Sequence, residues 1–156
     1  MILLSFKISY ATMEDIDLLV RHRVSMWNDI SAELTAAAPN FEEKTRGWIK
    51  KKLSEGNLIG FIARTQDGRV AGSGCLWIRE HPPIPMSVHL EVPYLLSMYT
   101  EVDFRRKGIG KMIVEAAIAW CRDRGYDRIN LDASEAGKRL YETLGFKPGY
   151  SMRLQL

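Results

Sequence analysis

The segment whose residue types are best suited to chemistry lies near position 108. It contains three cations and two glycines: Arg105, Arg106, Lys107, Gly108 and Gly110. An amphipathic helical pattern begins inside it. The first N–H groups of a helix have no partner within the helix, and the helix dipole is positive at that end. Glycine has no side chain to keep an anion away from these groups. The segment therefore predicts a phosphate-binding site, with a tight turn and a solvated basic run as the alternative.

Two common phosphate-binding motifs do not fit this segment. A Walker loop needs Ser or Thr after Lys111, where Met112 stands, and a glycine five residues before Gly110, which is missing. A dinucleotide fingerprint needs a third glycine at the position of Ile113. Both classes of nucleotide site are therefore excluded.

The pattern that does fit is Arg105-x-x-Gly108-x-Gly110. It resembles the acetyl-coenzyme A loop, [QR]-x-x-G-x-[GA], of GNAT-type N-acetyltransferases. The strand pattern at 95–100, the run 131–139 and the segment 140–146 (LYETLGF) also resemble segments of that family. The close resemblance covers residues 81–156, and the N-terminal half matches mainly in the order of its elements. It implies an α+β fold: one N-acetyltransferase domain over residues 1–156, with a central mixed, mostly antiparallel sheet that is flanked by helices and splayed at its central strands.

The resemblance also implies where acetyl-CoA would bind as the co-substrate. Backbone groups of Met98 and Thr100 would face the pantetheine arm and the thioester, and the N–H groups of 106–111 would hold the pyrophosphate. Ser134 stands where many members have an asparagine that contacts pantetheine. The residues expected to bind acetyl-CoA are Met98, Tyr99, Thr100, Arg105, Arg106, Lys107, Gly108, Ile109, Gly110, Lys111, Ser134, Gly137, Lys138 and Tyr141.

Tyr141 matches the family's tyrosine that protonates the departing thiolate. A phenol of pKa about 10 can give its proton to a thiolate of pKa about 8.5 at modest cost. The alternative is a buried aromatic residue of an amphipathic helix. The activity implied is transfer of an acetyl group from acetyl-CoA to a primary amine by direct attack on the thioester. A non-catalytic acyl-CoA-binding domain on the same fold is the competing interpretation.

The general base is not fixed by the sequence. A lysine-like ammonium is only about one part in 2,500 neutral at pH 7, so a base would help. Where the family often has Glu or His on the central strand, this chain has Tyr94 and Leu96. Glu91 is the nearest carboxylate in kind and is the predicted catalytic partner of Tyr141. Asp132 could also face the splay, each carboxylate could simply be solvated, and the base could be absent.

The elements that would position these residues follow from periodicity, caps and breakers. Helices are expected at 13–28, 41–54, 110–124 and 136–144, and strands at 2–8, 58–64, 70–78, 91–100, 128–131 and 146–154. Pro93 predicts an edge or a bulge within the strand 91–100. Trp27, Asn28, Asp29 and Glu33 are expected in the acceptor wall.

Composition limits the remaining classes. The chain has 156 residues, and 22 basic and 19 acidic side chains leave a net charge of +3, too small to imply nucleic acid. Two distant cysteines make neither a disulfide scaffold nor a metal cluster and favour a reduced, cytoplasmic setting. No apolar run approaches a membrane span, and no signal peptide is expected. The acceptor is left open, and edge strands near the C-terminus could pair in a homodimer.

Overall fold

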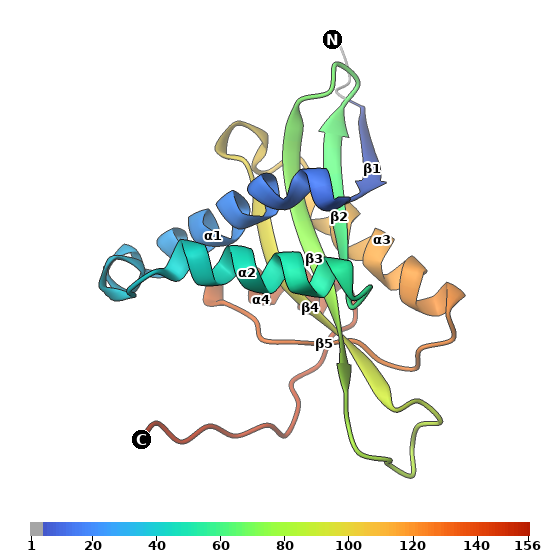
Figure 1. Cartoon of the computed structure of the whole chain (residues 1–156). Coiled ribbons are helices and arrows are strands. Elements are labelled where there is room, and N and C mark those ends of the chain that lie inside the picture. Colours follow the sequence, from blue (N-terminus) through green and yellow to red (C-terminus); the bar gives the residue numbers. More distant parts are fainter. Residues whose placement is uncertain (1–4) are drawn as a thin grey trace.

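The computed structural model describes residues 5–156, so the predicted strand positions Ile2 and Leu4 lie outside the described residues. The elements, in chain order, are β1 (Phe6–Tyr10), η1 (Met13–Asp15), α1 (Ile16–Ala37), α2 (Phe41–Ser54), β2 (Leu58–Thr65), β3 (Val70–Glu80), β4 (Glu91–Thr100), η2 (Val102–Phe104), α3 (Ile109–Asp123), β5 (Asn130–Leu131) and α4 (Glu135–Thr143). Figure 1 shows their arrangement around the sheet. None of the helices in residues 5–156 is long and apolar enough to cross a lipid bilayer.

The five strands form one open sheet in the order β1-β2-β3-β4-β5. The first three pairings are antiparallel. The last is parallel and joins only Tyr94 to Asn130 and Leu95 to Leu131. Beyond these two pairs β4 and β5 separate. The predicted mixed, mostly antiparallel sheet, splayed at β4 and β5, is therefore confirmed.

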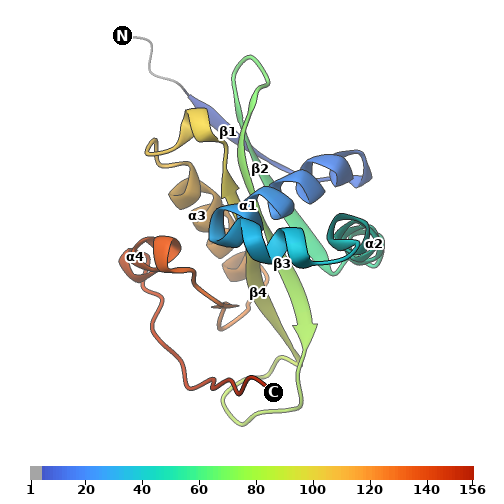
Figure 2. The same cartoon turned by 90° about the vertical axis from the view of Figure 1, so that its left-hand side faces the viewer.

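Each face of the sheet has its own core. Figure 2 shows α1 and α2 on one side and α3 on the other. Because side chains alternate along a strand, Cys75 packs with Leu19 of α1, and Leu76 packs with Ile113 of α3. α1 and α3 therefore pack against opposite faces of β3 and β4. The place beside them where β4 and β5 separate is called the β4–β5 fork below.

Of the two outcomes predicted for Pro93, an edge or a bulge, the structure has the edge, and the bulge of β4 lies at Ser97 instead. Pro93 pairs with Ile78 in regular register, and the register shift comes further on, where β4 carries one extra residue. Ser97 has a positive φ of 57° at this bulge. Pro93 is tolerated because β5 pairs with β4 only from Tyr94 onwards, which makes β4 an edge strand at the proline.

Two further expectations differ from the structure. α1 continues to Ala37 instead of ending near residue 28, and it bends at Ser31, where φ is −162° and ψ is 102°. The Ser31 hydroxyl accepts the N–H of Leu34, so it caps a second helical stretch. The predicted strands at 146–154 are not formed, because this segment pairs with no strand of the sheet, and its apolar side chains from residue 150 onwards stay uncovered. Those side chains are exposed: Tyr150, Met152, Leu154 and Leu156.

Gly72 of β3 lets the end of β4 approach closely, so we expect Gly72→Ala to destabilise the fold. A Cβ there would lie 2.7 Å from the Tyr99 carbonyl oxygen and 3.0 Å from Cγ2 of Ile109, so backbone must shift. Overpacking of this kind costs about 1–3 kcal/mol. For a chain of this size the melting temperature should fall by about 2–10 °C. Thermal denaturation followed by circular dichroism measures the change.

Gly47→Ala is the matched control. Gly47 lies inside α2, and a Cβ there would meet nothing within 4 Å. Alanine should stabilise this helix by about 0.5–1 kcal/mol. Equal melting temperatures for the two variants would contradict the tight approach of β3 to β4.

Candidate active site

The loop between β4 and α3 presents a row of free backbone donors. The six N–H groups from Arg106 to Lys111 make no hydrogen bond to an acceptor in residues 5–156. Gly108 is the N-cap of α3 and has a φ of 79°, and Arg106 also has a positive φ of 61°. No carboxylate lies in the first turn of α3. Together with the helix dipole, these free N–H groups are suited to bind an anion.

The three cationic side chains of this loop differ in what they do. Arg105 donates to the Asp29 carboxylate at 2.7 Å and to the Thr100 carbonyl at 3.1 Å, so it ties the loop to α1. This hydrogen bond to Asp29 raises the pKa of Arg105 above its ordinary value. The Lys107 ammonium donates to the Asp103 carbonyl at 3.2 Å. Arg106 is exposed and forms no ion pair within residues 5–156, so its charge is available to a ligand.

α4 lies against the start of this loop. A Cβ on Gly110 would be 3.2 Å from Cδ2 of Leu140, which places the first turn of α3 next to α4. Met98 of β4 and Tyr141 of α4 both pack against the core on the α3 side of the sheet. The structure therefore brings the loop, Met98 and Tyr141 to the same side of the β4–β5 fork.

Tyr141 is partly buried, and its hydroxyl is not used by the fold. Burial raises the pKa of Tyr141 above its ordinary value. Its ring packs edge-to-face on Phe146 at 5.7 Å, and its hydroxyl has no hydrogen-bond partner among the residues described. Gly137, one turn earlier, leaves room for the ring, since a Cβ there would lie 3.0 Å from Cε2 of Tyr141. The phenol is therefore free to donate to a ligand.

Ser134 and Lys138 complete the predicted cofactor residues on this side. The Ser134 hydroxyl accepts the N–H of Gly137 at 3.2 Å and so caps α4. Its side chain is therefore engaged by the fold. Lys138 lies on the exposed surface of the same helix.

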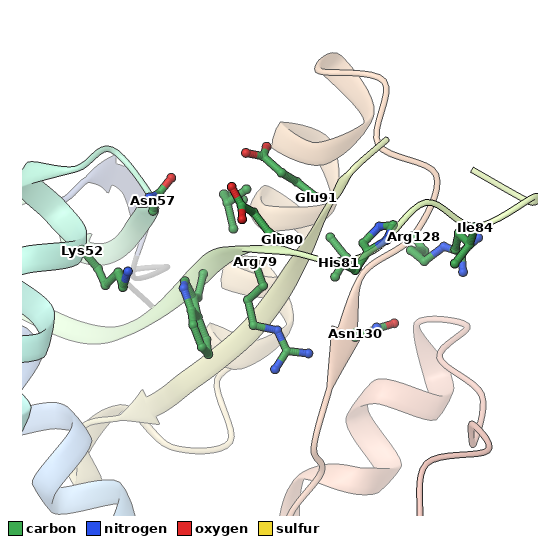
Figure 3. A pocket seen from close by; sticks show the side chains of 12 residues that line it. Lys52, Asn57, Arg79, Glu80, His81, Ile84, Glu91, Arg128 and Asn130 are labelled. Atoms are coloured by element: carbon green, nitrogen blue, oxygen red, sulfur yellow. The ribbon is translucent and has the colours of Figure 1, made fainter. Parts of the chain in front are cut away.

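Glu91 lies away from this group. It is the first residue of β4, seven residues before Met98, which at about 3.3 Å per residue is roughly 20 Å along the strand. It accepts the Tyr126 hydroxyl at 3.2 Å. It lines an open cleft of about 700 Å³, shown in Figure 3, and pairs in register with Glu80. The structure thus does not bring Glu91 together with Tyr141.

Asp132 is the carboxylate at the fork. It follows β5 directly and accepts the hydroxyl of Tyr94, so this hydrogen bond spans β4 and the chain after β5. Burial, together with that bond, raises the pKa of Tyr94 to about 12. Asp132 is exposed, so its carboxylate can also accept a hydrogen bond from a ligand.

A buried polar cluster under β4 was not expected from the sequence. His22 is fully buried in α1, where Nδ1 bonds the Ser73 hydroxyl at 2.6 Å and Nε2 bonds the Glu101 carboxylate at 2.9 Å. Arg21 also pairs with Glu101, at 2.7 Å. Burial lowers the pKa of His22, so the ring is neutral, donates to Glu101 and accepts from Ser73. This cluster fixes α1 to the point where β4 becomes the loop. Ser73 and Glu101 lie 51 and 79 residues from His22 in sequence, so no local pattern could have revealed the cluster.

Comparison with known proteins adds an independent result. The family model described as "Acetyltransferase (GNAT) family" matches residues 23–146. "Uncharacterized N-acetyltransferase YsnE" of Bacillus subtilis is 28% identical over 136 residues, which are 84% of this chain and 82% of that protein. Human N-acetyltransferase 8 is 28% identical over 101 residues, which are 63% of this chain, and the match spans only 42% of that protein.

Solved structures show the same architecture. A GCN5-related N-acetyltransferase from Ralstonia eutropha superposes with a TM-score of 0.88 at 26% identity, covering 97% of this chain and 99% of that one. A Clostridium acetobutylicum protein, described as a predicted acetyltransferase and crystallised with acetyl-CoA, gives 0.83 at 24% identity, covering 97% and 96% of the two chains.

Proposed function

The chain belongs to the acetyltransferase (GNAT) family, and from that premise we propose that residues 1–156 form an acetyl-CoA-dependent N-acetyltransferase domain acting on a primary amine. The observation that carries the proposal is the row of six free N–H groups at the start of α3, beside the β4–β5 fork. The structural similarity to a protein crystallised with acetyl-CoA supports it.

In this proposal the pyrophosphate of acetyl-CoA binds the N–H groups of 106–111, and the Arg106 side chain adds charge. The pantetheine arm then follows the open edge of β4, past Thr100 and Met98. β4 and β5 make no backbone pairs beyond Leu95 and Leu131, so the β4 edge has free backbone groups for the arm. The thioester would lie near the bulge at Ser97, where a backbone N–H can serve as the oxyanion donor.

The reaction proposed is a direct transfer. The neutral amine nitrogen attacks the thioester carbon, a C–N bond forms, and the carbonyl electron pair moves onto oxygen. The intermediate collapses, the C–S bond breaks, and the thiolate takes the hydroxyl proton of Tyr141. The amine proton goes to Asp132 or to water, since Glu91 lies at the other end of β4. The products are free CoA and an N-acetylated amine, and Tyr141 regains its proton from solvent.

Binding and turnover test the proposal separately. Acetyl-CoA at 100 times its Kd should add about 2.7 kcal/mol to the free energy of unfolding. For a chain of this size that is a rise of about 5–10 °C in melting temperature. Release of free thiol with a panel of amines then measures transfer. No thermal shift would refute the loop assignment, and a shift without thiol release from any amine would leave an acyl-CoA-binding domain.

A further inference from the structure

The face of α1 that packs against the sheet carries a half-buried arginine, Arg23. Arg23 follows Leu19 and Val20 on the side of the helix that packs against the sheet. Its Nη1 donates to the Ser97 hydroxyl at 2.9 Å, and Ser97 is the bulged residue of β4. The guanidinium therefore reaches the point of β4 beside which the thioester is proposed to lie.

This cation has no counter-charge within residues 5–156. Several arginines that reach across elements pair with a carboxylate: Arg21 with Glu101, Arg64 with Asp15, Arg46 with Asp17, Arg105 with Asp29 and Arg153 with Asp132. Arg79 has no carboxylate partner among the described residues either, but its guanidinium stacks on the Tyr94 ring at 4.1 Å. Arg23 instead has Ser97, Cys75 and Tyr94 around it. Burial raises the pKa of Cys75 and of Tyr94 to about 12, so both are neutral at pH 7. Burial also lowers the pKa of Arg23, although an arginine stays charged at physiological pH.

The same face of α1 also carries a buried donor that has no acceptor among the described residues. Nε1 of Trp27 is buried and has no hydrogen-bond partner among the described residues. Trp27 lies one turn after Arg23, and residues four apart share a helix face. Buried charges and buried donors are costly unless they are paired, so the arrangement favours a ligand that brings an anionic acceptor group.

We infer that the acceptor amine carries a carboxylate, which binds Arg23 beside the β4 bulge, and that the acceptor is therefore an amino acid. The inference rests on the proposed function and names its substrate class. A planar guanidinium matches a carboxylate with two parallel hydrogen bonds. Arg23 is next to the bulge, so amine and carboxylate must be close together, as they are in an α-amino acid.

A negative charge, the Asp132 carboxylate, lies at the hydroxyl end of Tyr94, where the exposed Arg153 is 3.8 Å from it. The Tyr94 hydroxyl donates to Asp132, and the Tyr94 ring lies in the surroundings of Arg23. A zwitterion with its carboxylate at Arg23 would therefore find a carboxylate for its ammonium group at Asp132. A simple amine or a polyamine would leave Arg23 unpaired and would place its own positive charge near the guanidinium.

Binding to the CoA-saturated protein tests the inference without requiring turnover. Titration calorimetry compares L-amino acids with their amides, which keep side chain and amine but remove the negative charge. The best-bound amino acid should bind at least 10-fold more tightly than its amide. Arg23→Gln should abolish this ratio, and Arg23→Lys should retain part of it. Arg122→Gln, an exposed arginine at the far end of α3, should leave it unchanged.

Several outcomes would overturn the inference. Equal affinity for acid and amide in the parent protein would do so even if Arg23→Gln failed to fold. So would a ratio that persists in a folded Arg23→Gln variant, recognised by its retained thermal shift with CoA. A preference for malonyl-CoA over acetyl-CoA that Arg23→Gln removes would place the carboxylate on the acyl donor instead. Selective amino-acid binding without thiol release would refute only the proposed function, and thiol release solely with amines that lack a carboxylate would refute only this inference.

Discussion

Gly108→Val is expected to abolish binding of CoA and acetyl-CoA while the chain still folds. The protein itself leaves space at this position, since a Cβ on Gly108 would meet nothing within 4 Å. A valine there would instead occupy the space in front of the free N–H groups at the start of α3, where we place the pyrophosphate. Loss of these contacts should weaken binding at least about 100-fold, or about 2.7 kcal/mol. Calorimetry with CoA measures it directly.

The backbone conformation requires a control, because a β-branched residue at a φ of 79° is strained. Gly125 provides it. This glycine ends α3, has a φ of 74°, and also has open space around its Cβ. Gly125→Val should lose about the same stability, of order 1–3 kcal/mol, yet bind CoA like the parent. If both variants lose binding equally, strain is the cause and the phosphate lies elsewhere.

The features that the sequence predicted well are those with a local cause. Glycines in positive φ at Gly108, Gly125 and Gly145 mark the start of α3 and the ends of α3 and α4. The strands expected at 58–64 and 70–78 are β2 and β3, which pair with each other across the turn that contains Gly68. The free N–H groups of 106–111 also have a local cause, because they lie at the start of a helix.

The features that it missed depend on contacts between distant segments. Proline predicted an edge or a bulge at position 93, and only the pairing with β3 and β5 shows that the proline lies at an edge and the bulge at Ser97. The sequence predicts that Arg105 binds phosphate. In the structure its guanidinium donates to Asp29, which lies 76 residues away in sequence. Arg23 follows Leu19 and Val20 at the spacing of residues that face the core of a helical protein. Only the structure shows that the groups around its guanidinium are neutral, so that its charge has no partner among the described residues.

Tyr141→Phe should lower kcat by about 10²–10⁴-fold near pH 7 and leave the affinity for acetyl-CoA nearly unchanged. The substitution keeps the ring that packs on Phe146 and removes only the hydroxyl. That hydroxyl bonds no other described residue, so the free energy of unfolding should hardly change. Tyr150→Phe is the matched control, since Tyr150 is fully exposed in the C-terminal tail and should leave kcat unaltered.

The pH dependence separates an acid from a packing residue. Burial raises the pKa of Tyr141, so the parent keeps its phenol protonated through pH 9 and does not lose its acid in this range. A thiol of pKa about 8.5 leaves increasingly well as a thiolate above that pH, so the proton from Tyr141 becomes less necessary. The deficit of Tyr141→Phe should therefore shrink from pH 7 to pH 9. A deficit that stays constant across this range would mean that the hydroxyl positions the substrate, and a parental kcat at pH 7 would mean that the ring alone matters.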